Sequence, residues 1–437
     1  MTRNRLAILA AALALALASI STIGCQGLLA AGGGGEDGPA LRLMPDAVPP
    51  SQESTTDVRA ADLDLDGDLD LVWAGQAADP ERWPDGTVTL GINDGTGVFS
   101  SEGTGVADLG PWTFVTVNDL DDDGDADLVL TKPARTRAEV AVLVNDGAAH
   151  FTAAMVPEIT GEADGLVFGA VAAADVDMDG DSDLVVPIFS NVDITADRAN
   201  VLLLNDGAGN FARDTESRLP VLAPDSDWTL SIAVGDVTGD GAPDLFVGEA
   251  DRAPRLLVND GGGRFVDRSD DDGVGARSMP MDVMRAYRTE MTDLDLDGDL
   301  DVTVINDVSA SQPTTLIGNF FFHNDGAGHF DLVEMPLPGG RRDARGLALA
   351  DMDMDGRPDI VVGNGNEFVP NDGEAVSVLL ARGDGYMQVP RIPTFDFGVF
   401  GVAAGDFDGD GRPDLALAVA LPGSTGDLSD VILRSIP

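Results

Sequence analysis

An acidic nonapeptide recurs seven times along the chain, and its residue types are those that bind a hard cation. The first copy runs Asp-Leu-Asp-Leu-Asp-Gly-Asp-Leu-Asp from Asp62 to Asp70, and successive copies begin 55 to 61 residues apart. Aspartate fills positions one, five and nine of every copy and position three of six, which makes 27 carboxylates. Ca²⁺ takes six to eight oxygen ligands, and alternate residues of a tight loop can direct their oxygens at one centre. We therefore expect up to seven calcium sites.

The expected ligands stand at positions one, three, five, seven and nine of each copy. In that order they are Asp62, Asp64, Asp66, Asp68 and Asp70; Asp119, Asp121, Asp123, Asp125 and Asp127; Asp175, Asp177, Asp179, Asp181 and Asp183; Asp236, Thr238, Asp240, Ala242 and Asp244; Asp293, Asp295, Asp297, Asp299 and Asp301; Asp351, Asp353, Asp355, Arg357 and Asp359; Asp406, Asp408, Asp410, Arg412 and Asp414. Position seven is expected to offer its backbone carbonyl, so its side chain varies, and the invariant glycine at position six permits the sharp turn. Thr238 replaces a carboxylate, which predicts the weakest site in the fourth copy.

Three other interpretations of the acidic loops are disfavoured. An EF-hand needs a glutamate at position twelve followed by a helix, whereas that position here is apolar in every copy. Those residues are Trp73, Leu130, Val186, Val247, Val304, Val362 and Leu417. Mg²⁺ seldom takes so many protein ligands. Solvated turns without a metal would leave clustered like charges unneutralised. Seven divalent ions would add fourteen charges and bring the formal charge from -50 to -36.

A second signal places the loops within a repeating unit. Asn-Asp-Gly, whose residues tolerate positive φ and favour a hairpin turn, begins at Asn93 and lies 23 to 31 residues after the start of each of the first five copies. It decays in the sixth to the segment 382–386. Short apolar runs such as 128–130 and 201–204 flank the two signals and have the length of strands. Each unit of about 55 to 60 residues thus predicts four strands, as in one propeller blade.

The two ends of the repeat region predict that the blades close into a ring. The seventh unit stops after the apolar run 431–433 and lacks its hairpin and last strand. Residues 40–44 resemble that missing strand, and its pairing with the last unit would hide the sheet edges. An open solenoid is the alternative, but it would need capping units. We expect an all-β fold, a seven-bladed β-propeller of four-stranded blades over residues 40–437, in which the N-terminal strand completes the last blade.

The first 39 residues have the features of an export signal and a tether. Arg3 and Arg5 precede an apolar run over 6–23, and the segment 22–25, ending in Cys25, resembles the lipobox of bacterial lipoproteins. The resemblance implies a signal peptide over 1–25, lipidation of Cys25 and a Gly-rich tether over 26–39; an ordinary signal peptide is the alternative. No later run of 18 apolar residues exists. We expect an exported protein that is lipid-anchored in the bacterial cell envelope.

The repeating units resemble the FG-GAP and VCBS repeats found in the propeller of integrin α-subunits. The resemblance rests on the Asp-x-Asp-x-Asp-Gly-x-x-Asp loops and the Leu/Ile/Val strand after each, and it covers roughly residues 40–437. It implies the propeller fold and calcium sites that mainly stiffen the blades. The departures are Thr238 and the altered sixth hairpin. These motifs are specific for fold and metal and say little about the ligand.

The net charge and the composition of the loops restrict the kinds of partner that the protein can bind. The net charge of -50 disfavours nucleic acid and anionic membrane surfaces. We expect a protein or carbohydrate ligand to bind the variable loops on the face opposite the acidic loops. We expect the protein to be a monomer. The candidate ligand-binding residues are Trp83, Trp112, Trp228, Arg285, Tyr287, Arg288, Arg341 and Arg345. Trp112 and Trp228 have packing between blades as an alternative role. The fifth unit departs most, because segment 285–290 is polar where other units are small and apolar.

Catalytic patterns are scarce, which favours a binding protein over an enzyme. The sequence has no His-Glu-x-x-His, Gly-x-Ser-x-Gly or Walker-type motif. Our main hypothesis is a calcium-binding cell-envelope lipoprotein that binds a protein or glycan, as in adhesion. The first alternative is a calcium-dependent polysaccharide lyase or other carbohydrate-active enzyme on the same fold. The second is a purely structural envelope component.

Overall fold

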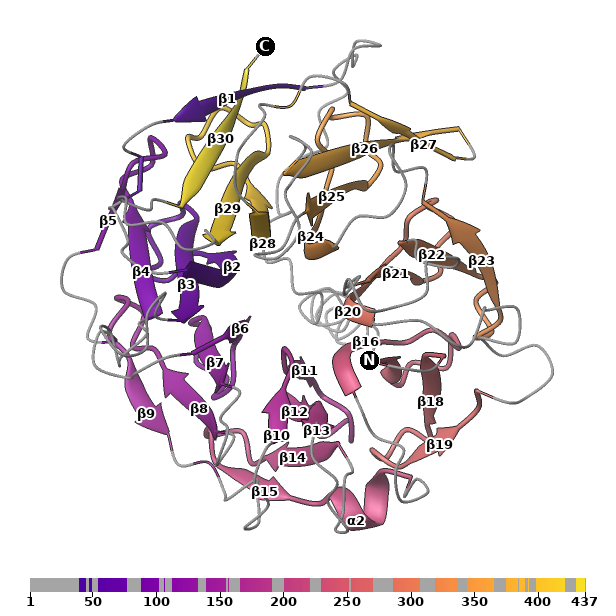
Figure 1. The fold of residues 1–437 in the computed structure, drawn as a ribbon. Helices are drawn as coiled ribbons and strands as arrows, with labels where there is room; N and C mark the ends of the chain where they lie inside the picture. Colours follow the sequence, from indigo (N-terminus) through magenta and orange to yellow (C-terminus); the bar gives the residue numbers. More distant parts are fainter. Residues whose placement is uncertain are drawn as a thin grey trace, which may run out of the picture.

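A ring of antiparallel sheets forms the molecule. In the computed structural model the described strands pair into seven four-stranded sheets and one two-stranded sheet, and the four-stranded sheets are the blades of a seven-bladed β-propeller (Figure 1). The fold predicted from the repeat is therefore confirmed. The structure describes residues 39–44, 47–48, 54–76, 88–101, 106, 112–132, 139–154, 156, 166–190, 200–220, 229–250, 253–269, 286–306, 319–335, 344–364, 375–383, 385–389, 392, 398–420 and 430–436.

In blades 1 to 6 the strands follow the chain from the inner to the outer edge, and in blade 7 the N-terminal strand takes the outer position. Blade 1 contains β2 Ser54–Ala61, β3 Asp70–Gln76, β4 Val88–Asn93 and β5 Phe99–Ser100, and blade 2 contains β6 Phe114–Asn118, β7 Asp127–Lys132, β8 Glu139–Val144 and β9 Thr152–Ala154. Blade 3 contains β11 Ala172–Ala174, β12 Asp183–Val186, β14 Val201–Asn205 and β15 Phe211–Arg213, and blade 4 contains β16 Thr229–Gly235, β17 Asp244–Glu249, β18 Arg255–Asn259 and β19 Phe265–Asp267. Blade 5 contains β20 Ala286–Thr292, β21 Asp301–Asn306, β22 Phe320–Asn324 and β23 Phe330–Glu334. Blade 6 contains β24 Ala344–Ala350, β25 Asp359–Asn364, β26 Val376–Arg382 and β27 Gly385–Gln388, and blade 7 contains β28 Gly398–Gly405, β29 Asp414–Ala420, β30 Val431–Ile436 and β1 Ala40–Met44.

Blade 3 departs from the regular pattern. Pro187, which has no N–H to donate, separates β12 from β13 Ile188–Ser190, and β13 pairs with β10 Leu166–Phe168 as a separate two-stranded sheet. One short helix, α2 Thr215–Arg218, follows the outer strand of this blade. Each acidic loop lies between the first two strands of its blade, as the sequence predicts.

The N-terminal strand completes the last blade. Strand β1 pairs antiparallel with β30, with Ala40 opposite Ile436 and Met44 opposite Ile432. Figure 1 shows β1 running along the outer edge of the blade that ends the chain. The predicted ring closure is therefore confirmed, and it replaces a free sheet edge with a paired one.

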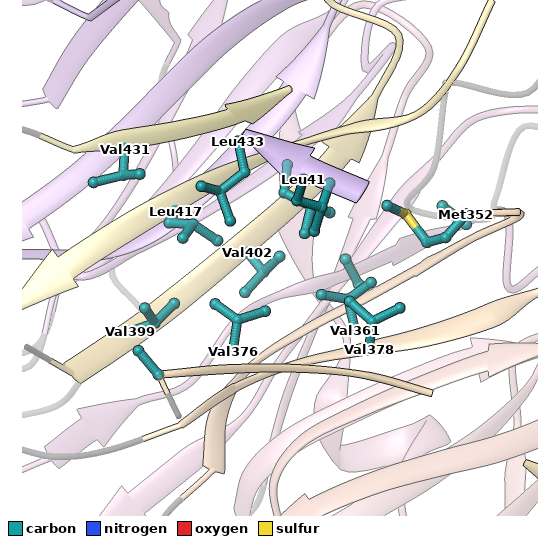
Figure 2. Packing of buried hydrophobic residues seen from close by; sticks show 14 of the residues in the cluster. Leu41, Met352, Val361, Val376, Val378, Val399, Val402, Leu417, Val431 and Leu433 are labelled. Carbon is teal, nitrogen blue, oxygen red and sulfur yellow. The ribbon is translucent and has the colours of Figure 1, made fainter. Parts of the chain in front are cut away.

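The core is divided among the interfaces between blades. Seven clusters of buried apolar side chains each join two neighbouring blades, so every blade packs on both sides. Figure 2 shows the cluster between blades 6 and 7, where Val361 and Val378 approach Val402 and Leu433. Leu41 of β1 enters the same cluster. The N-terminal strand therefore contributes to the core as well as to strand pairing.

We predict that Leu41→Ala destabilises the protein while Leu43→Ala in the same strand does not. Leu41 is 8% exposed and Leu43 is 41% exposed. Loss of the buried side chain leaves a cavity, which lowers the free energy of unfolding by about 2–3 kcal/mol, whereas the exposed site should change it by less than about 0.5 kcal/mol. Chemical denaturation of the calcium-loaded protein measures both. Equal effects at the two sites would argue against ring closure by β1.

Candidate metal centres

The seven acidic loops share one backbone shape. The position-one carboxylate accepts a hydrogen bond from the N–H of the position-six glycine, as from Gly124 to Asp119 Oδ2 at 3.1 Å and from Gly356 to Asp351 Oδ2 at 2.8 Å. That glycine has a positive φ in every copy, for example 94° at Gly124. An L-residue with a side chain rarely adopts this conformation, which explains the invariant glycine. The local sequence therefore determines the loop conformation.

The loop carboxylates converge as metal ligands do. Ligand oxygens of Asp119, Asp121 and Asp127 all lie within 4.8 Å of one another, and equivalent groups form in other blades. Those groups include Asp175, Asp177 and Asp183; Asp62, Asp64 and Asp66; Asp293, Asp295 and Asp297. Oδ1 of both Asp119 and Asp121 is buried and lacks a hydrogen-bond partner among the described residues. A buried charged oxygen without a partner is costly, so the residues fit a hard divalent cation.

The position-nine aspartate has a structural role that the sequence analysis did not identify. Asp127 is fully buried and accepts hydrogen bonds from two backbone N–H groups, Leu120 at the start of its own loop and Asn145 on the third strand. The same pair of bonds recurs at position nine of all seven blades. This carboxylate therefore ties the loop to the centre of its own blade, in addition to facing the other acids.

Burial makes these position-nine aspartates unusual acids. Without a cation, burial raises the pKa of Asp127, Asp183, Asp359 and Asp414 to about 7 and that of Asp70 and Asp244 to about 6. The backbone N–H groups oppose this shift, and neighbouring loop carboxylates add to it. A bound divalent ion would favour the ionised form, so metal binding and proton release are coupled at these sites.

The asparagine of the hairpin motif joins neighbouring blades. Asn145 Nδ2 of blade 2 donates to Leu63 O, at position two of the blade 1 loop, at 2.8 Å. The predicted hairpin is confirmed, and this second role is one that turn propensity does not indicate. Equivalent bonds run from Asn205 to Leu120, from Asn259 to Val176, from Asn324 to Val237 and from Asn93 to Phe407. Ala381 and Ser435 stand at this register in blades 6 and 7.

Basic side chains enter several acidic loops. Arg382 contacts Asp353 and Asp355 in blade 6, and Arg434 contacts Asp408 and Asp410 in blade 7. In blade 3, Arg218 of α2 places Nη1 3.1 Å from Asp177 Oδ2. In blade 5, His323 Nδ1 lies 3.5 Å from Asp301 Oδ2, and this carboxylate raises the pKa of the imidazole. A cationic side chain offsets part of the loop charge, so we expect these loops to bind a metal less tightly than those of blades 1 and 2.

The candidate ligand-binding residues fall into three groups. Trp83, Trp228, Arg285 and Arg341, like the lipidation candidate Cys25, lie outside the described residues. Trp112 is 4% exposed and packs in the cluster between blades 1 and 2, which favours its packing role. Tyr287, Arg288 and Arg345 lie on the inner strands β20 and β24, so their predicted placement in loops is wrong. The polar character of these residues suggested a loop, but they lie on strands. Their side chains face other polar and aromatic groups at the ring centre.

The described part of the structure contains no helix whose length and apolar character would let it span a bilayer.

We predict that Asn145→Ala destabilises the protein by about 2 kcal/mol, because it removes the side-chain amide that donates to the carbonyls of Leu63 and Ala126; Leu63 O keeps its bond from the N–H of Ala149. Asp146→Ala changes the next residue of the same turn, which is exposed, and should cost less than about 1 kcal/mol. Denaturant titration of both variants with calcium present makes the comparison. Similar losses for the two would show that only turn formation matters at this hairpin.

We predict that Arg434→Leu tightens calcium binding by the seventh loop. Leucine is the residue at this register in blade 3, Leu204. Arg434 is 36% exposed, so its ion pairs are worth about 1 kcal/mol and their removal should raise affinity roughly fivefold. Isothermal titration of the chelator-stripped protein measures this change. Arg264→Leu removes the same charge from an exposed hairpin of blade 4 and is the control; an identical gain there would indicate a net-charge effect alone.

Comparison with known proteins agrees with the repeat and the fold. The model of the FG-GAP-like repeat matches residues 119–186, 189–247 and 293–362. A search of curated proteins found no match. Among solved structures, the Dos1 propeller is 10% identical over 88% of this chain and 78% of its own, with a TM-score of 0.46. BBS1N, crystallised in complex with ARL6DN and soaked with lead, is 13% identical over 91% of this chain and 97% of its own, with a TM-score of 0.49.

Both TM-scores lie below 0.5, so the fold assignment rests on the strand pairing of this chain rather than on those likenesses. The matched repeats lie in blades 2 to 6, and the same acidic loop and strand order recur in blades 1 and 7. The chain therefore contains FG-GAP-like repeats and fits a seven-bladed β-propeller built from them.

Proposed function

We propose that this protein is a calcium-binding propeller of the bacterial cell envelope that binds a protein or glycan ligand. The observation that carries the proposal is the convergence of carboxylate oxygens in the acidic loops, some of them buried and without partners among the described residues. Ca²⁺ is the ion whose oxygen preference and coordination number suit such a set. When bound, it would supply charge neutralisation and rigidity rather than reaction chemistry.

The position of the loops explains why a cation would stiffen the whole ring. In blades 1, 3, 4 and 5 the second glycine of the hairpin packs against position three of the preceding blade's acidic loop: a Cβ on Gly209 would lie 3.7 Å from Asp121 Cβ, and one on Gly97 would lie 3.4 Å from Asp408 Cβ. The hairpin asparagine bonds to the same loop. A cation that orders one loop therefore supports the interface with the next blade.

Envelope attachment is supported by the sequence alone. The basic start, the apolar run and Cys25 form the lipoprotein-like signal, and the Gly-rich segment after it would separate the propeller from the membrane. A rigid ring on a flexible tether suits a protein that presents a binding surface outside the cell or in the periplasm. The ligand class, protein or glycan, is the one expected from the variable loops and the polar fifth blade.

Removal of calcium tests the proposal. We expect elemental analysis of the purified full chain to find up to seven Ca²⁺, and we expect EGTA to lower the melting temperature. The raised aspartate pKa values predict the pH dependence: these groups bind protons more tightly folded than unfolded, so the metal-free protein is most stable at low pH and loses stability as the pH rises through about 6–7.

Metal-free protein should therefore melt higher at about pH 5 than at about pH 8, and saturating calcium should reverse that order because it binds the ionised ligands. Melting curves at the two pH values, with and without calcium, provide the measurement. Absence of calcium in the purified protein, together with a melting temperature that chelation leaves unchanged, would refute calcium binding by these loops.

A further inference from the structure

Side chains from non-adjacent blades meet across the central channel. Arg288 on β20 of blade 5 places Nη2 2.6 Å from Asp57 Oδ1 on β2 of blade 1, although the two residues are 231 positions apart in sequence. Figure 1 places β2 and β20 on different sides of the ring centre. Phe114 of blade 2 and Tyr287 of blade 5 also approach across the channel, with ring centroids 6.2 Å apart. The middle of the channel is therefore bridged by charged and aromatic groups.

A cavity of about 90 Å³ lies beside this bridge. It is lined by the inner strands of blades 1 to 5 along most of their length. Small side chains from 170–173 and 231–234 form one wall, and Arg59, Arg288 and Glu290 contribute charged groups. Tyr287 and Phe114 supply aromatic surface. The cavity thus combines an apolar wall with several buried polar groups, the usual composition of a small-molecule site.

Arg288 is hydrogen-bonded to Asp57, whereas Arg59 lies close to two carboxylates without a hydrogen bond to either. Arg59 Nη1 lies 3.8 Å from Glu290 Oε1, and Arg59 Nη2 lies 3.9 Å from Asp57 Oδ2, both beyond hydrogen-bond distance. Arg288 is 3% exposed, and its Nη1 is buried without a hydrogen-bond partner in the described residues. Thr289 Oγ1 is likewise buried and unpartnered. Donors and an acceptor therefore face a space that a group able both to accept and to donate would fill.

The charge balance selects the class of ligand. When all four are ionised, Arg59 and Arg288 carry two positive charges and Asp57 and Glu290 carry two negative ones, so these four side chains together are neutral. A carboxylate ligand would add an uncompensated negative charge near Glu290. A cationic ligand would add an uncompensated positive charge near the arginines. Both are costly in a buried site. A hydroxyl group accepts from a guanidinium and donates to a carboxylate without adding charge.

We propose that this cavity binds a neutral, hydroxyl-rich sugar residue, with Arg59, Arg288 and Glu290 bonding its hydroxyls and Tyr287 contacting its apolar face. The proposal rests on the proposed ligand-binding function and names its ligand class. It places the site in the central channel, on the inner strands, rather than on the variable loops.

Monosaccharide binding to the calcium-loaded full chain tests this site. The probes are D-glucose, D-galactose and D-mannose, compared with D-glucuronate and D-galacturonate, and the readout is saturation-transfer NMR followed by titration calorimetry. We expect at least one neutral sugar to bind, and the uronates to bind roughly tenfold or more weakly because of repulsion by Glu290. Uronate binding as tight as that of the neutral sugars would overturn the charge argument.

Two variants locate the site. Ala170→Phe fills the cavity and should abolish binding, whereas Ala212→Phe adds the same ring to the exposed outer strand of blade 3 and should leave it unchanged. Glu290→Gln gives the charge group a net positive charge and should shift preference toward the uronates. Melting temperature and calcium content report whether each variant is folded. If Ala170→Phe does not fold, Glu290→Gln still tests the site.

Neutral-sugar binding that survives in folded Ala170→Phe, or a lack of binding by all five probes, would refute the channel site. Either result is distinguishable from failure of the proposed function. In that case a protein or a longer glycan would still bind the variable loops, and calcium would still be required for stability.

Discussion

Each acidic loop of this propeller is also part of an interface between blades, and this coupling underlies the rest of the structure. The hairpin of one blade packs against the loop of the blade before it, through a glycine contact in four blades and through an asparagine hydrogen bond in five. Repulsion among clustered carboxylates therefore acts on the packing of the ring. Any group that neutralises the loop carboxylates therefore also stabilises the packing between neighbouring blades.

The chain combines different means of neutralisation. Asp70 and its equivalents are buried and hydrogen-bonded to backbone N–H groups, which offsets part of the cost of removing a carboxylate from water. Arg382 and Arg434 bring positive charge to the loops of blades 6 and 7. In blades 1 and 2 the described contacts of the loop carboxylates are mainly with backbone N–H groups. The seven loops are thus similar in shape but different in electrostatic surroundings.

The side chains at the centre of the ring differ in character from those of the acidic loops. Small residues at the inner strands of blades 3 and 4 leave space, while Arg288 and Tyr287 of blade 5 reach across to blades 1 and 2. Arg345 lies over the rings of Tyr287 and Phe400, so blades 6 and 7 are connected to the same group. Three arginines close together at the centre of a protein with a net charge of -50 are a local arrangement that overall composition does not indicate.

The sequence by itself determined the fold, the strand order and the loop conformation, because these depend on local chemistry repeated at a regular spacing. The glycine of the acidic loop, the hairpin turn and the apolar strands all act over a few residues, and the incomplete seventh unit predicted its partner in residues 40–44. Tertiary structure decided the rest. That Asn145 bonds to the preceding blade, that Arg434 enters a loop and that Arg288 meets Asp57 depend on how seven blades curve into a ring. Contacts across a ring join positions far apart in the chain, so no local pattern encodes them.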